Sequence, residues 1–143
     1  MNKKAERFQA YLAEKNLNFF QVQEMTDEYK TVVFRSNIEI KGQNLPTIII
    51  TDETIWTLIR IQIVAGAAQG DKKASVQDYL NGLNQKYKAF KFYVADNGDV
   101  IMDISVPTIA DHFDAEMLRS LLQITVEQLT DIYPQIMEVV WAK

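Results

Sequence analysis

The side chains best suited to acid–base chemistry lie around the single histidine of the chain, His112. Asp111 precedes it, Asp114 follows it closely, and Asp103 lies a short distance upstream. A histidine can act as a general base when a carboxylate within hydrogen-bond distance orients it and a pocket tunes its pKa. This pattern would suit a small-ligand-binding protein or a hydrolase that uses His112 with Asp103 or Asp111. The alternative, which we favour, is that His112 and Asp111 lie in solvent just before a helix.

Metal and cofactor sites find little support in the sequence. The chain has no cysteine, so a zinc site would need three carboxylates beside the one histidine, which is unusual. The run DNGD at 96–99 suggests a calcium loop, but with Gly98 at its sixth position the positions that require oxygen ligands hold Tyr93, Ala95 and Ile104. The segment 66–72 lacks the Ser or Thr of a phosphate-binding loop. We therefore predict no catalytic residue, no cofactor and no metal.

Several apolar side chains are candidates for binding. Phe19, Trp56 and Tyr93 could line a ligand pocket, although aromatic residues in sheets are more often core or cross-strand partners. Met117 and Ile124 fall about 100 to 120° from the apolar stripe of the last predicted helix, beyond the arc that one sheet covers. Either the first helix or a second copy of the chain would then cover them. We predict a partner or dimer surface that includes Met117, Ile124, Tyr93 and Ile101.

Length and charge narrow the class of protein. The chain has 143 residues, which suits one domain over 1–143 with a core of its own. Its 15 basic and 19 acidic residues give a net charge of -4, whereas binding to nucleic acid needs a basic face. The start of the chain lacks the apolar run of a signal peptide, and no stretch approaches the roughly 20 apolar residues that span a bilayer. We expect a cytoplasmic protein that binds neither nucleic acid nor membrane.

The first half of the chain reads as a helix followed by four strands. Apolar residues at helical spacing predict a helix over 3–15, and strand-like runs follow at 17–25, 31–41, 45–50 and 55–64. In the second and fourth of these strands apolar and polar residues alternate. This pattern is typical of an antiparallel sheet that helices cover on one face, and it predicts a polar face on the other side. A turn is expected at 42–44, between the second and third strands.

The second half reads as a helix, a β-hairpin and a long helix. We expect a loop over 65–73, with Ser75 as the N-cap of the helix that follows. In the long helix Asp114 is the expected N-cap. Pro134 should kink or end that helix, or open a short final one, because proline lacks an N–H and clashes with the preceding turn.

The turn of the hairpin can be decided by register. A two-residue loop at Asn97-Gly98 would mix polar and apolar groups on both faces of the hairpin. A three-residue loop over 96–98, with Gly98 in the left-handed region, pairs Val94 with Val100 and Phe92 with Met102 instead. It also sets Lys91 opposite Asp103 on the other face. We therefore predict the three-residue loop.

The run from Leu80 to Pro107 also carries a family resemblance. It reads LNGLNQKYKAFKFYV, then DNGD, then VIMDISVP, with a long helix after it. This half of the chain resembles the YbjN-type bacterial sensory transduction regulators, whose fold is that of the type III secretion chaperones. The chain departs from the family pattern at Ser105-Val106, where an acidic residue is usual, and at 110–113, where a glycine is usual. The resemblance implies a chaperone-like or regulatory protein that binds segments of other proteins.

Together these observations predict an α+β fold. It consists of a six-stranded antiparallel sheet with helices packed on one face, in the order helix, four strands, helix, β-hairpin and long helix. The function we expect is that of a non-enzymatic protein-interaction module, chaperone-like or regulatory, that acts as a homodimer.

Overall fold

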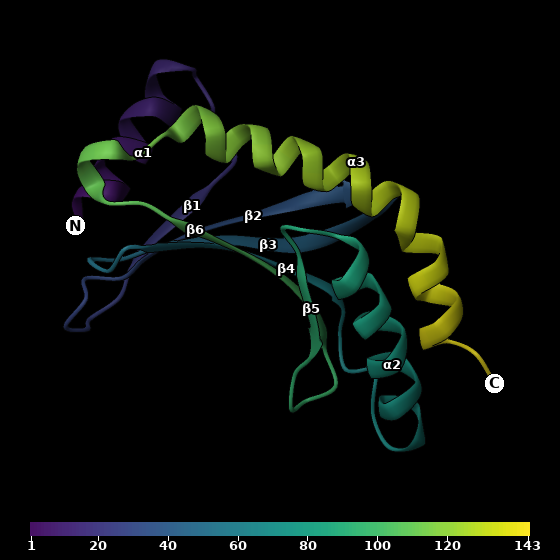
Figure 1. Cartoon of the computed structure of the whole chain (residues 1–143). Helices are drawn as coiled ribbons and strands as arrows, with labels where there is room; N and C mark the ends of the chain where they lie inside the picture. Colours follow the sequence, from purple (N-terminus) through teal and green to yellow (C-terminus); the bar gives the residue numbers. More distant parts are fainter.

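A six-stranded antiparallel sheet forms the centre of the computed structural model, which describes residues 1–143 (Figure 1). The strands lie in the order β1-β2-β3-β4-β6-β5, so β1 and β5 are the two edges. The elements are α1 (Lys3–Glu14), β1 (Gln21–Glu24), β2 (Val32–Ile40), β3 (Gln43–Thr51), β4 (Trp56–Val64), α2 (Asp71–Lys86), β5 (Lys91–Val94), β6 (Val100–Pro107), the short 3-10 helix η1 (Ala110–His112) and α3 (Ala115–Val140). The predicted α+β architecture and its element order are confirmed.

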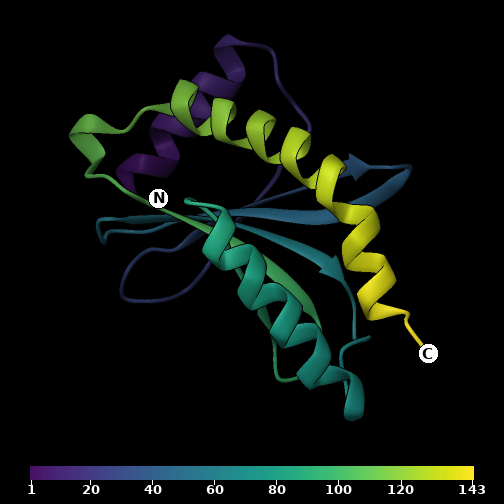
Figure 2. The ribbon, with the colours of Figure 1, turned by 45° about the vertical axis from the view of Figure 1, so that its right-hand side comes forward.

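All three α-helices lie on the same face of the sheet (Figures 1 and 2). Alternate strand residues point toward them, since successive side chains of a strand point to opposite faces. The core between helices and sheet includes the fully buried side chains Phe8, Phe34, Ile59, Leu80, Met102 and Leu129. The covered face therefore agrees with the alternation seen in the sequence.

The β5–β6 hairpin has the predicted register. Val94 pairs with Val100, Phe92 with Met102 and Lys91 with Asp103. Gly98 has a φ of 88°, a left-handed conformation that glycine adopts at little cost. The three-residue loop is confirmed.

Helix α2 begins earlier than predicted. It starts at Asp71, within the expected loop, with Gly70 as its N-cap residue. Ser75 lies inside the helix, where its hydroxyl donates to the carbonyl of Lys72. The preceding segment is anchored by tertiary contact, because buried Ala68 donates its N–H to the carbonyl of Gly98. A contact of that kind leaves no mark in the local sequence.

The turn between β2 and β3 is also shorter than predicted. It consists of Lys41 and Gly42, with φ of 50° and 79°, and Ile40 pairs directly with Gln43. Positive φ at both central residues is the pattern of a type I′ turn, whose twist matches that of the flanking strands. As a result β3 begins at Gln43 and contains Pro46.

Helix α3 has its predicted N-cap and bends without ending at its proline. Asp114 accepts a hydrogen bond from the N–H of Met117 at 3.0 Å. The helix then continues through Pro134 to Val140 and bends visibly over its second half (Figure 1). Thr125 and Thr130 each donate a hydroxyl to the carbonyl four residues earlier, and such bonds, like proline, bend helices. The bend brings the last turns of α3 over the ends of β3 and β4.

Candidate functional site

The face of the sheet opposite the helices is uncovered, and it is less polar than predicted. We call it the open face. Val33, Ile50 and Leu58 are cross-strand neighbours on it and form an apolar row, with Ile48 beside the row. Val33 is 6% exposed and the other three are half-buried. The expectation of a polar face is wrong here because Ile48-Ile49-Ile50 is apolar in succession, so β3 presents isoleucine to both sides of the sheet.

An ion pair between a buried carboxylate and a partly exposed arginine lies next to the apolar row. Asp103 is 2% exposed and accepts two hydrogen bonds from the guanidinium of Arg60, at 2.9 and 3.0 Å. The hydroxyl of Tyr93 donates to the same carboxylate at 3.2 Å. The hydrogen bond to Asp103 raises the pKa of Arg60, and burial, followed by the charge of Asp103, raises the pKa of Tyr93. Arg60 and Tyr93 thus both bond to Asp103, so this cluster is suited to fixing the sheet.

Of the two strand residues predicted to meet a partner, one is accessible. Tyr93 and Ile101 are cross-strand neighbours on the open face, and Tyr93 is half-buried. Ile101, however, is only 7% exposed, because β6 lies inside the sheet and places it between Gln62 and Tyr93. The prediction that Ile101 offers a contact surface is therefore corrected. The sequence shows that β6 is a strand but not that it has a neighbour on each side.

The two α3 residues singled out by their helical position lie in solvent. Met117 is 54% exposed and Ile124 is 45% exposed. Helix α1 therefore does not cover them, which removes one of the two explanations that the sequence left open. The three aromatic residues considered for a ligand pocket are not brought together, since Phe19 precedes edge strand β1 while Tyr93 lies on the opposite edge, β5. Trp56 is 50% exposed at the start of β4.

The structure does not bring His112 together with the carboxylates considered for catalysis. His112 is exposed in η1. Asp103 is engaged with Arg60 on the open face, and Asp111 forms an ion pair with Arg7 at 3.7 Å. His112 shares a pocket of about 250 Å³ with Asp114, whose carboxylate caps α3. No cluster of three or more His, Cys, Asp or Glu residues could hold a metal ion.

The fold and these surfaces define a scaffold with an uncovered sheet face and exposed apolar residues on its longest helix. The chain belongs to the YbjN family, described as "Putative bacterial sensory transduction regulator", whose model matches residues 5–138. The match also includes the first half of the chain, beyond the run from Leu80 to Pro107 that carries the resemblance. A comparison with curated proteins finds no match. None of the helices has an apolar stretch long enough to cross a membrane.

Proposed function

We propose that the protein is a non-catalytic, cytoplasmic regulator that binds another protein through the open face. The half-buried side chains of Ile48, Ile50 and Leu58 carry this proposal, and buried Val33 supports them from the neighbouring strand. Contiguous apolar side chains on an uncovered surface are typical of sites where proteins associate. Membership in a family of regulators agrees with this function.

The charges on the open face indicate the chemistry of the partner. Arg35, next to Ile48, is bonded to the amide oxygen of Gln23 and has no carboxylate within ion-pair distance. Lys91 lies over the ring of Tyr93 at 5.3 Å and is likewise free of an acidic partner. In a chain with a net charge of -4, these two cations attract an acidic surface. The partner we propose presents apolar side chains flanked by carboxylates.

The proposal predicts that a cross-linker on the open face captures a defined partner. A photoreactive amino acid at Leu58, introduced in the living bacterium, should give one discrete adduct that is absent when the same group replaces exposed Ser75 on α2. With the captured partner purified, Leu58→Lys should weaken binding by about tenfold or more, since burying a leucine contributes roughly 1.5 to 3 kcal/mol. Arg35→Glu should weaken it as well, and Lys88→Glu, the same kind of charge reversal at an exposed residue just after α2, should not.

Two results would contradict the open face as a binding surface. One is the same set of adducts from Leu58 and Ser75. The other is a partner that binds the Leu58→Lys and Arg35→Glu variants as tightly as the wild type while both variants keep the wild-type melting temperature.

The proposal also includes a homodimer formed through α3. Met117 and Ile124 lie two helical turns apart on the same side of α3. A two-fold axis between them would pack α3 of each copy antiparallel to the other, so that Met117 of each copy meets Ile124 of the other. One copy thereby covers the exposed apolar residues of the other.

Light scattering tests the dimer directly. We expect the wild type to have twice the chain mass of 16.5 kDa. The variant Met117→Asp/Ile124→Asp should have the mass of one chain, because four carboxylates would then meet at the two-fold axis. Ile109→Asp, a change at a residue that is equally exposed but lies outside α3, should remain a dimer. A wild-type protein that is monomeric at high concentration would rule out this part of the proposal.

A further inference from the structure

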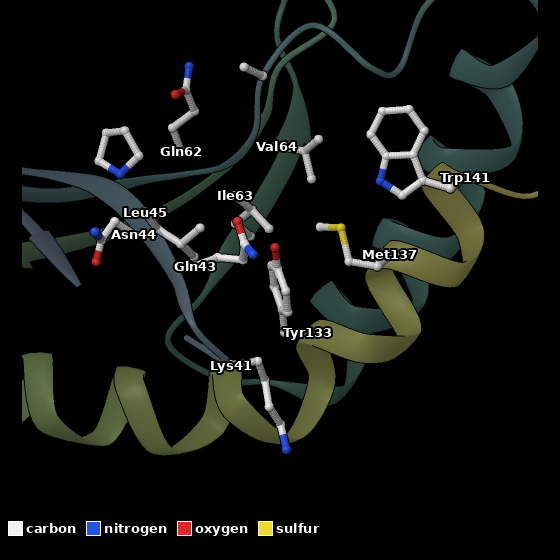
Figure 3. Close-up of a pocket in the computed structure, with 12 residues that line it drawn as sticks. Lys41, Gln43, Asn44, Leu45, Gln62, Ile63, Val64, Tyr133, Met137 and Trp141 are labelled. Carbon is white, nitrogen blue, oxygen red and sulfur yellow. The ribbon is translucent and has the colours of Figure 1, made fainter. Parts of the chain in front are cut away.

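Strands β3 and β4 separate at one end of the sheet. They pair from Thr51 and Thr57 as far as Thr47 and Ile61. Beyond that point, residues 43–46 of β3 pair only with β2, while the end of β4 pairs only with β6. The last turns of α3 lie against this opening (Figure 3). The result is a pocket of about 740 Å³, which we call the fork pocket and which includes Asn44, Leu45, Gln62, Val64, Tyr133 and Met137.

Pro46 explains why the strands separate. Because Ile40 and Gln43 pair across a two-residue turn, the odd-numbered residues of β3 direct their peptide groups toward β2 and the even-numbered ones toward β4. Pro46 is therefore on the β4 side, where it has no N–H to continue the ladder. The peptide N–H and C=O of Asn44, the next residue on that side, consequently have no strand opposite them.

A second unpaired polar group faces the same pocket. The side chain of Tyr133 is 9% exposed, and it points from α3 toward the opening between the strands (Figure 3). Its hydroxyl makes no hydrogen bond within the protein and is reached by solvent, since Thr57 Oγ1 is the one buried side-chain polar atom without a partner. This hydroxyl can therefore bond to a group that enters the pocket.

The remaining lining combines apolar side chains with the amides of Gln43 and Gln62 and is almost uncharged. Leu45 and Ile63 are buried beneath it, and Val64 and Met137 are half-buried along its walls. Lys41 is the single charged residue of the lining. The volume lies within the range of about 300 to 1,000 Å³ that is usual for ligand sites, but the lining offers no set of charges to recognise a small ionic ligand. What it offers is an unpaired stretch of backbone beside apolar side chains.

We propose that the fork pocket binds an extended, uncharged segment of another protein. The backbone of the segment pairs with Asn44 as an added strand, an apolar side chain packs on Val64 and Met137, and a peptide group bonds to the hydroxyl of Tyr133. This site is separate from the apolar row on the open face and from Met117 and Ile124, so it does not depend on the function proposed above.

A displayed library of random short peptides tests the proposal, with the full-length protein as the target. We expect it to yield peptides that alternate apolar and uncharged polar residues. Met137→Lys should weaken the selected peptide about tenfold or more, since it removes apolar contact and places a charge in the pocket. Tyr133→Phe, which keeps the ring in the core, should weaken it about three- to tenfold through the lost hydrogen bond. Met117→Lys, the same substitution at the other end of α3, and Leu58→Lys on the open face should leave the affinity unchanged.

Two further measurements examine the added strand itself. Methylating the backbone nitrogens of the selected peptide one at a time should abolish binding at the position that pairs with Asn44. In NMR spectra, the amide hydrogen of Asn44 should exchange more slowly when the peptide is present. The proposal is overturned if the library yields no binder, or if binding survives Met137→Lys and Tyr133→Phe in variants with the wild-type melting temperature. It is equally overturned if the peptide binding is lost with Leu58→Lys.

Discussion

Replacing Arg60 by methionine should destabilise the protein by about 3 kcal/mol, because it leaves the Asp103 carboxylate buried without its cation. Asp103 is 2% exposed, and its two hydrogen bonds to Arg60 are the shortest it makes, at 2.9 and 3.0 Å. The bond from Tyr93 would remain, but a single hydroxyl cannot neutralise the charge. The measurement is urea unfolding monitored by circular dichroism.

The double variant Arg60→Met/Asp103→Leu is the matched control for this prediction. Removing both charges leaves no buried ion to solvate, and replacement of a buried ion pair by apolar residues is often neutral or stabilising. We expect its stability to return to within about 1 kcal/mol of the wild type. If the single variant were as stable as the double one, Asp103 would be solvated in solution and the pair would not fix the sheet.

Replacing Asn2 by alanine should cost about 2 to 4 kcal/mol, more than any ordinary helix cap. The side-chain oxygen of Asn2 accepts from the N–H of Ala5 at 2.8 Å and so caps α1. Its amide nitrogen donates to the carbonyls of Lys30 and Thr51, at 2.8 and 3.1 Å. Asn2 is 2% exposed, so water cannot readily take its place at the two carbonyls, and an unsatisfied buried acceptor costs about 1 to 3 kcal/mol.

Asp114→Ala separates the cost of the cap from the cost of the carbonyls. Asp114 caps α3 in the same way but is exposed, so its loss should cost about 1 kcal/mol. The difference between the two variants, measured by thermal unfolding, then reports the contact of Asn2 with Lys30 and Thr51. Equal losses for both variants would show that Asn2 acts as a cap alone.

The elements that depend on neighbours in the chain were predictable. The hairpin register followed from period-two alternation and from Gly98, and the start of α3 followed from Asp114, because both depend on residues only a few positions apart. The same holds for part of the candidate site, since the helical positions of Met117 and Ile124 indicated that no sheet would cover them. The prediction was wrong at the start of α2, where the contact of Ala68 with Gly98 anchors the preceding segment. It was also wrong at the turn between β2 and β3, where the twist of the strands favours the two-residue turn of Lys41 and Gly42.

The sequence by itself determined the fold class, the hairpin and the α3 residues that the sheet does not cover, because these depend on local spacing and chain-local hydrogen bonds. Only the tertiary structure decided which strands are neighbours. The strand order buries Ile101 and joins Arg60 to Asp103. The folded chain also brings Asn2 to Thr51. It also decided that the missing N–H of Pro46 faces β4 and opens the fork pocket beneath Tyr133. The physical reason is that burial and hydrogen bonding between distant segments depend on their arrangement in space, which alternation along one strand does not encode.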